Sequence, residues 1–222
     1  MNRVDIRNRV REITELTSDD VSDTVIDLYA RDGFERIINL ERRWPFYETS
    51  TTLTTVASTQ AYSVTGISAT MREVVSLRES TRGEVLDLVG HNTAEDVWGP
   101  TETGRPIAYS KWADSLYLWP TPSAAYTYTV RGYRQPTSWW ESDAAEIDAD
   151  ERLHTAVVYF VISRLYQLQE DAEMSAFYAQ TFAEAVTSAH REIMRPDSSR
   201  PLTLSSGIRG VRGRSWRSRL AL

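Results

Sequence analysis

Apolar residues recur at three- and four-residue steps between Asp148 and Met194, and this period predicts two successive α-helices. The first helix is apolar nearly all round, whereas the second has one apolar stripe opposite a polar face. The positions that carry the two stripes are Leu153, Val157, Val161, Leu165, Met174, Phe177, Phe182, Val186 and Ile193. A helix that is apolar on all sides must be covered on several sides, so we expect the remaining segments to pack around this pair.

The same helical period occurs near the N-terminus, over residues 3–16 and again up to about Arg43. Residues 17–20, Thr-Ser-Asp-Asp, offer a hydroxyl cap and acids for the first turn of the second of these helices. Gly33 inside that helix is a candidate position for a kink. Trp44 precedes Pro45 and should end the helix, because a residue before proline avoids the helical region.

From Thr49 onward, short runs rich in threonine, valine and tyrosine replace the helical period and predict β-strands. The expected strands are 51–56, 60–64, 72–77, 84–88, 107–112, 115–119 and 125–133. We expect the first two to form a hairpin and the next two a second hairpin. A short helix over residues 91–98, capped by Asn92 or Thr93 and closed by Gly99-Pro100, should lie between the second hairpin and the last three strands.

These elements predict an α+β fold. A helical bundle of N-terminal helices and a long C-terminal helix pair should carry an inserted, small antiparallel β-sandwich or barrel and an extended C-terminal arm. The expected divisions are residues 1–48, 49–146, 147–194 and 195–222.

Charge is unevenly distributed along the 222 residues, although the formal net charge is only −6. Residues 195–222 contain seven arginines and a single acid, so this segment carries +6 and the first 194 residues carry −12. The basic segment has too few apolar residues to fold alone. No run of 18 apolar residues is present, so we expect no membrane contact. The chain has no cysteine, which excludes disulfides, thiolate nucleophiles and cysteine metal sites.

No residue pattern indicates catalysis, and we predict no catalytic residue, no cofactor and no metal. The acids before the first long helix could hold a cation or act as a carboxylate pair, but a helix cap in a solvated connector accounts for them better; they are Glu141, Asp143, Glu146, Asp148, Asp150 and Glu151. The histidines His91, His154 and His190 lack the spacing of a zinc site, and His154 is expected to be a packing residue.

Aromatic residues gather in the strand region, where they could form a stacking platform for carbohydrate or nucleic acid. A β core with a protein interface is the favoured interpretation. The candidate residues for such a protein interface are Trp98, Trp112, Trp139 and Trp140. Residues 208–219 interleave arginine with glycine and Trp216, and composition leaves three roles open for them: phosphate binding, ordering on a protein partner, or an inert solvated tail.

Four motifs occur in the order found in one family. Residues 41–46 close a helix with W-P-F, and residues 51–64 resemble the pattern T-x-x-G/A-x-x-x-Y. Residues 104–136 match G-x-P and L-x-P-x-P and then resemble Y-x-V-x-Y-x-x-x-P, in succession. Residues 153–159 resemble the opening of a long helix usually written H-E-A-L-V, with threonine in place of the acid. Together these motifs span roughly residues 35–190, and the chain resembles the phage head-to-tail adaptor proteins.

The resemblance implies a structural virion protein and no enzyme. It implies a homo-oligomeric ring, commonly of twelve subunits, in the neck between the portal protein and the tail or further connector proteins. Double-stranded DNA would pass through the lumen without specific binding, and a C-terminal arm would dock on the portal. The arm residues are Arg209, Arg212, Arg214, Trp216, Arg217 and Arg219. The alternatives are a tail-associated cell-wall hydrolase that uses Glu146 or Asp148, and an arginine-tailed DNA-binding protein.

Overall fold

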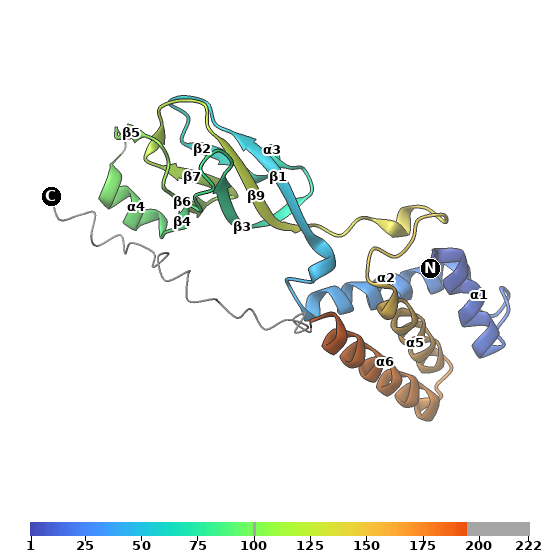
Figure 1. The fold of residues 1–222 in the computed structure, drawn as a ribbon. Helices are drawn as coiled ribbons and strands as arrows, with labels where there is room; N and C mark the ends of the chain where they lie inside the picture. The colour runs from blue at the N-terminus through green and yellow to red at the C-terminus, as the bar shows by residue number, and fades with distance from the viewer. Residues whose placement is uncertain (100, 195–222) are drawn as a thin grey trace, which may run out of the picture.

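The computed structural model describes residues 1–99 and 101–194, which form two adjoining parts (Figure 1). We call them the helical unit and the β unit. The helical unit consists of α1 (Arg3–Thr14), α2 (Asp23–Leu40), α5 (Glu151–Leu168) and α6 (Ala172–Ile193). The β unit contains the strands together with α3 (Val64–Ile67) and α4 (His91–Trp98). This arrangement confirms the predicted α+β class with a C-terminal helix pair.

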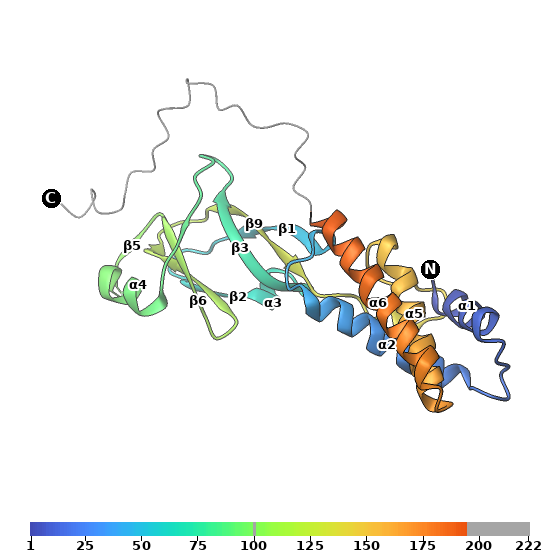
Figure 2. The same ribbon diagram turned by 90° about the horizontal axis from the view of Figure 1, so that it is seen from below.

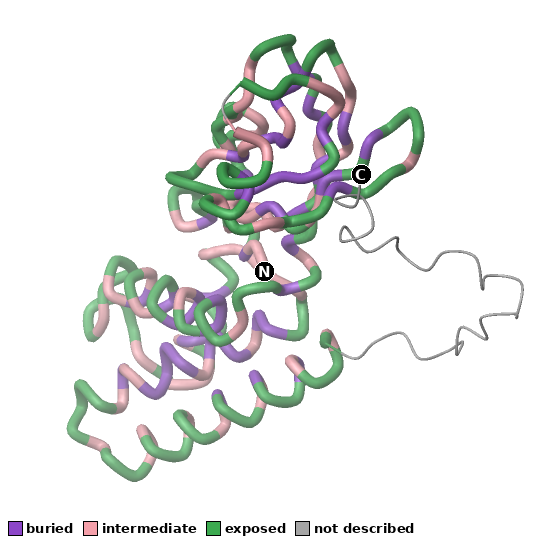
Figure 3. Tube along the Cα trace, turned by 90° about the vertical axis from the view of Figure 1, so that its left-hand side faces the viewer, coloured by how far each residue is buried: buried purple, intermediate pink, exposed green. Residues whose placement is uncertain are grey.

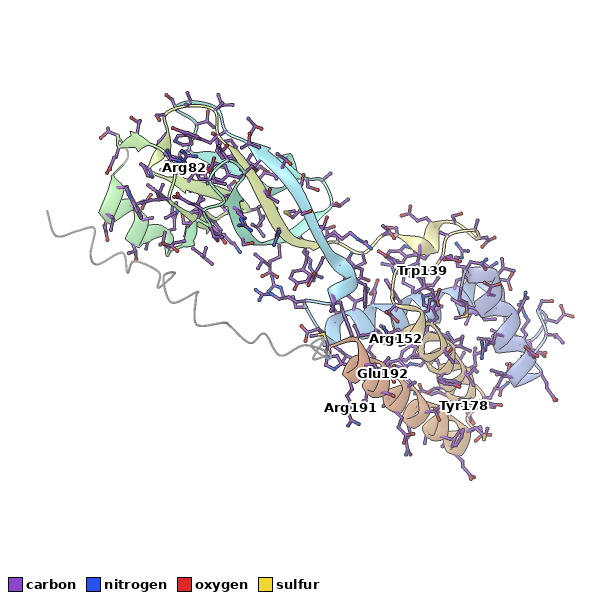
Figure 4. All side chains as sticks on the ribbon, viewed as in Figure 1. Arg82, Trp139, Arg152, Tyr178, Arg191 and Glu192 are labelled. Carbon is purple, nitrogen blue, oxygen red and sulfur yellow. The ribbon has the colours of Figure 1, made fainter. Side chains whose placement is uncertain are left out.

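Helix α5 is the centre of the helical unit, as its all-round apolar pattern predicts. Most of its residues are buried against α6, α2 and α1, whereas α6 buries only one stripe and exposes its outer face (Figure 3). Asp150 caps α5 by accepting a hydrogen bond from the Arg152 N–H at 3.1 Å. The start of α5 meets the end of α6, where Arg152 Nη1 lies 3.5 Å from Glu192 Oε2 (Figure 4).

The two N-terminal helices differ from the prediction at their ends. Helix α2 starts at Asp23, after Ser22, because Thr17 and Asp20 instead close the turn before it through a 2.7 Å side-chain hydrogen bond. The helix is continuous through Gly33 and ends at Leu40, and Trp44 before Pro45 is extended as expected. Gly33 serves close packing, since a Cβ there would lie 2.9 Å from Phe160 Cδ1.

The β unit has two main sheets and a small pair. The orders are β1-β9-β3, β2-β7-β6-β4 and β5-β8. The strands are β1 (Glu48–Thr54), β2 (Ala61–Ser63), β3 (Met71–Glu79), β4 (Asp87–Leu88), β5 (Thr103–Gly104), β6 (Ala108–Trp112), β7 (Ser115–Trp119), β8 (Thr121–Pro122) and β9 (Thr127–Arg134). Buried apolar residues such as Leu77, Leu116 and Val130 form a core that is separate from the core of the helical unit.

The first predicted hairpin is wrong, because its two strands belong to different sheets. β1 pairs with β9 over seven residues, from Glu48↔Tyr133 to Thr54↔Thr127, and β2 pairs with β7. An alternating pattern specifies which face of a strand is buried, but it does not specify the partner strand.

The second predicted hairpin is half right. The Leu86 N–H donates to the Leu77 carbonyl at 2.9 Å, but β4 then pairs in parallel with β6. The short helix α4 matches its predicted bounds, with Gly90 in place of Asn92 or Thr93 before its first turn.

Two further segments complete the description. The 3₁₀ turns η1 (Pro45–Tyr47) and η2 (Trp139–Glu141) lie between the units, in the chain that enters and the chain that leaves the β unit (Figure 1). Among the described residues, no helix has the length and apolar character needed to cross a membrane.

Candidate docking surfaces

An ion pair joins the end of β9 to the segment before α5. Arg134 binds Asp148 through two parallel hydrogen bonds of 2.6 and 2.7 Å, and the Thr137 N–H donates to the same carboxylate at 2.7 Å. The Tyr47 hydroxyl donates to the Asp148 carbonyl at 2.6 Å, and the Arg134 guanidinium lies 5.0 Å from the Tyr47 ring centroid. We call these four residues the joint clamp, because they connect η1, β9 and the connector to α5.

The joint clamp keeps Asp148 ionised. Burial alone would raise the pKa of the Asp148 carboxyl, but the hydrogen bonds from Arg134 and Thr137 outweigh burial and hold that pKa below its ordinary value. Both oxygens of this carboxylate are occupied by protein donors. Asp148 is therefore a structural anion, poorly suited to act as a general acid.

A second ion cluster fastens α1 to α2 and to the connector. Arg7 donates from Nε to Asp27 Oδ1 at 2.8 Å, and Arg3 donates to Asp27 Oδ2 at 2.6 Å. Asp143 lies 3.3 Å from Arg3 Nε and 3.2 Å from Arg7 Nη2. The hydrogen bond with Asp27 raises the pKa of Arg7 above its ordinary value.

The predicted helix cap in a solvated connector is confirmed for most of the six acids, and Asp148 is the main departure from it. The side chain of Asp148 is only 16% exposed, Asp143 and Asp148 bind arginines, and Asp150 caps α5. Glu146 is 78% exposed and lies 4.0 Å from the amino group of Met1. The described residues contain no group of acids and histidines arranged to hold a metal ion.

The histidines occupy separate environments. His154 is buried, with Nε2 3.1 Å from the Ala149 carbonyl and Nδ1 3.3 Å from the Met1 amino group, so the expected packing role is confirmed. Burial and that amino group lower the pKa of His154. His91 stacks under Trp112 in the β unit. His190 packs against Trp44 near the end of α6.

The four candidate tryptophans differ in exposure. Trp112 is 58% exposed and stacks on the His91 ring, with centroids 5.5 Å apart. Trp98 is half-buried against Trp119, and Trp140 is half-buried beneath the Arg31 guanidinium at 4.8 Å.

The prediction is wrong for Trp139, which is labelled in Figure 4. Its side chain is 1% exposed and meets the Phe34 ring edge-on, with the ring centroids 5.6 Å apart. It is a core residue of the helical unit and is not available for docking.

The open depressions on the surface do not resemble active sites. One of about 530 Å³ lies on the face of the sheet β1-β9-β3, and its only charged lining residues are Glu48 and Arg131. Another of about 490 Å³ lies between α2 and α5 and is lined by Asp32, Glu35, Arg36 and Arg164 with neutral residues. Neither brings together the groups of a nucleophile and its base.

A family model described as SU10 adaptor protein matches residues 1–205. The chain belongs to the SU10 adaptor protein family. This is a phage head-to-tail adaptor family, so the resemblance found in the sequence is confirmed. A search among curated proteins finds no match.

As a member of this family, the adaptor is a structural phage protein. The family is not an enzyme family. It implies a place in the virion neck, oligomerisation, and contact with other head or tail proteins. The match covers every described element of the adaptor and continues to residue 205. The predicted arm residues Arg209, Arg212, Arg214, Trp216, Arg217 and Arg219 lie outside the described residues.

One surface of the adaptor was missed in the sequence, namely the outer edge of β1. The sequence predicts a strand over residues 51–56, but it also predicts a local hairpin partner, which would leave β1 without this free edge. The structure instead places β1 at the border of its sheet. The available signal was the absence of a tight-turn sequence such as Asn-Gly between the two runs.

Proposed function

We propose that the adaptor is a subunit of a ring between portal and tail, through which double-stranded DNA passes, and that its C-terminal arm docks on the portal. The observation that carries this proposal is the family match over residues 1–205. The resemblance suggests twelve subunits as the ring size. The described residues support a role based on shape, because their clustered charges are engaged in ion pairs that join elements of the fold.

A ring subunit needs two different faces, because each copy contacts its neighbours heterologously. The helical and β units supply an elongated body with distinct sides (Figure 1). We propose Trp112, Trp98 and Trp140 as residues of the subunit or tail contacts. Trp112 is the strongest of these candidates, because a large aromatic side chain that is 58% exposed is typical of an interface anchor.

The charge layout fits a DNA passage. Residues 1–194 carry a net charge of −12, so a lumen formed by this body would repel the DNA phosphates. Repulsion avoids the counterion-release affinity that basic channels have for DNA, and the double helix could slide without sticking. The arm, at +6, is the basic part and is proposed to bind acidic groups of the portal.

Sedimentation of the adaptor with and without purified portal tests the proposal. We expect the full chain to sediment as a ring-sized complex with portal, and the chain lacking residues 196–222 to remain separate while keeping its circular dichroism spectrum. Replacing Arg209, Arg212, Arg214, Arg217 and Arg219 with glutamine should weaken docking by at least about tenfold, since even one lost charge-assisted hydrogen bond is worth about 1.5–3 kcal/mol.

The lysine version of the same five positions is the matched control. It keeps the charge but loses the planar fork, so it should dock better than the glutamine version. Full docking by the truncated chain would refute the arm, and failure of the intact chain to form any complex would refute the ring subunit.

A further inference from the structure

Among the described residues, the outer edge of β1 presents backbone groups that no neighbouring strand meets. The Thr55 N–H donates to the Tyr126 carbonyl at 2.8 Å, which places the odd-numbered residues of β1 in hydrogen-bonded pairs with β9. The backbone groups of Ser50, Thr52 and Thr54 therefore point away from β9. Within residues 1–99 and 101–194, no hydrogen-bond partner meets the N–H groups of these three residues. Such an edge is a template for a further strand.

The other edges of the two main sheets are protected in ways that β1 lacks. On β3, the Val75 carbonyl accepts a 2.9 Å hydrogen bond from the Tyr109 hydroxyl, the Val74 carbonyl accepts one from Lys111, and two register shifts interrupt the strand. β2 has three residues and β4 only two. β1 has seven residues in unbroken register, without proline or lysine. Natural proteins normally blunt or cover an edge of this kind.

We propose that residues 201–206 of the same chain cover this edge as a strand parallel to β1. Residues 202–206, Leu-Thr-Leu-Ser-Ser, are the longest run in 195–222 without proline, glycine or charge. Leucines alternate with a hydroxyl residue here, which is the period of a strand with one apolar face. Pro201 takes the first position, where a strand tolerates proline. The family match ends at residue 205 and so includes most of this run.

The segment starts within reach of β1. His190 near the end of α6 lies 4.0 Å from the Glu41 carboxylate, and its ring is 5.3 Å from that of Trp44. Only η1 separates Trp44 from the first residue of β1, and both ribbon views place the end of α6 beside the base of the β unit (Figures 1 and 2). The six residues 195–200 can span about 20 Å when extended, so residue 201 can reach Glu48.

This starting point sets the direction of the proposed strand and the side of the sheet to which each of its side chains points. A segment that arrives at Glu48 and runs toward Thr54 is parallel to β1. The inner face of β1 carries Leu53, which is 7% exposed, and its outer face carries hydroxyl side chains. The leucines at 202 and 204 extend the inner face, and the hydroxyl side chains at 203 and 205 extend the outer face.

The added strand would also set where the arm begins. If the proposed function holds, the arginine-rich residues 207–222 leave from the far end of β1, beyond Thr54, and not from the end of α6. The portal would then meet the end of the β unit that lies away from the helices.

Amide hydrogen exchange of the adaptor without portal tests the added strand. We compare the full chain with chains ending at residue 206 and at residue 200. The amides of Ser50, Thr52 and Thr54 should exchange about tenfold or more slowly in the first two chains than in the third. The amides of Thr51 and Leu53 face β9 and serve as the internal control. In the full chain, Leu204→Pro should match the chain ending at 200, and equal exchange in all chains would overturn the proposal.

Because the chain has no cysteine, introduced pairs report contact directly. Neighbouring strands lie about 4.8 Å apart, within the Cα range of a disulfide. Thr52→Cys with Thr203→Cys or Ser205→Cys should give a cross-linked monomer on oxidation. Val75→Cys on the opposite edge, combined with the same partners, is the control and should not. A disulfide between two chains, or none, would refute pairing within one chain, whatever the outcome of portal docking.

Discussion

Asp148→Asn tests whether the joint clamp holds the two units together. The substitution keeps the size of the side chain and one carbonyl oxygen but removes the charge that pairs with Arg134. Breaking one partner of a fully buried ion pair costs about 3–5 kcal/mol. The side chains of Asp148 and Arg134 are 16% and 27% exposed, so solvent screens part of this loss. We expect a loss of about 2 kcal/mol, or about 4–8 °C in Tm for a protein of this size.

The stability that Asp148→Asn removes should be smaller at low pH than at neutral pH. Because the pKa of Asp148 is lower in the folded than in the unfolded chain, the unfolded chain binds the proton first as pH falls. The clamp's contribution is therefore present above the unfolded value of about 3.9 and is lost as pH falls through the folded value. Urea unfolding followed by tryptophan fluorescence at pH 7 and near pH 3 measures both free energies.

Glu146→Gln is the matched control in the same connector, because the Glu146 side chain is 78% exposed. It should change the free energy of unfolding by less than about 0.5 kcal/mol. Arg134→Lys keeps the charge but removes the two-pronged geometry, and should give an intermediate loss. Equal stability of the asparagine and glutamine variants at pH 7, or a difference that persists unchanged at low pH, would refute this account of the clamp.

Three further predictions concern packing and protonation. Gly33→Ala should destabilise by about 1–3 kcal/mol in urea, because its Cβ would press on Phe160, whereas Gly66→Ala, whose nearest contact is 3.6 Å, should not. Leu118→Ala should cost about 2–5 kcal/mol, since the side chain is fully buried in the β core; a loss under 1 kcal/mol would contradict that core. Tm should fall as pH drops from 7 to 5, because the pKa of His154 is lower in the folded chain, and His154→Gln should flatten this dependence; an unchanged slope would rule the histidine out.

The helices could be predicted from sequence because their signal is local. The apolar period of α5 and α6 reports which faces are buried, and Asp150 and Asp171 lie where each helix is capped. The strands were also recognisable, but their partners were not, since β1 pairs with β9 about 80 residues later and not with the next run.

The roles of the side chains between the two units could not be predicted either, because their partners are distant along the chain. Trp139 and Trp140 are adjacent and chemically identical, yet one is in the core and the other at its rim. Phe34 from α2 contacts both rings, so neither the local sequence nor this shared neighbour predicts which tryptophan is buried. Asp148 looked like one acid among six, and its arginine partner lies on β9, with no helical spacing to connect the two.

Two of the motifs that carry the family resemblance, residues 41–46 and the end of residues 104–136, reach the place where the two units meet. Trp44 is fully buried between Phe46 and His190, and Arg134, in the last strand motif, forms the joint clamp. β1 pairs along its whole length with β9, so the strand that enters the β unit is tied to the strand that leaves it. A ring subunit must present its faces at a fixed angle, because a small error is repeated at every contact around the ring. If the adaptor forms the proposed ring, the joint clamp would help to hold this angle, and Asp148→Asn should then impair assembly more than its loss of about 2 kcal/mol in stability would suggest.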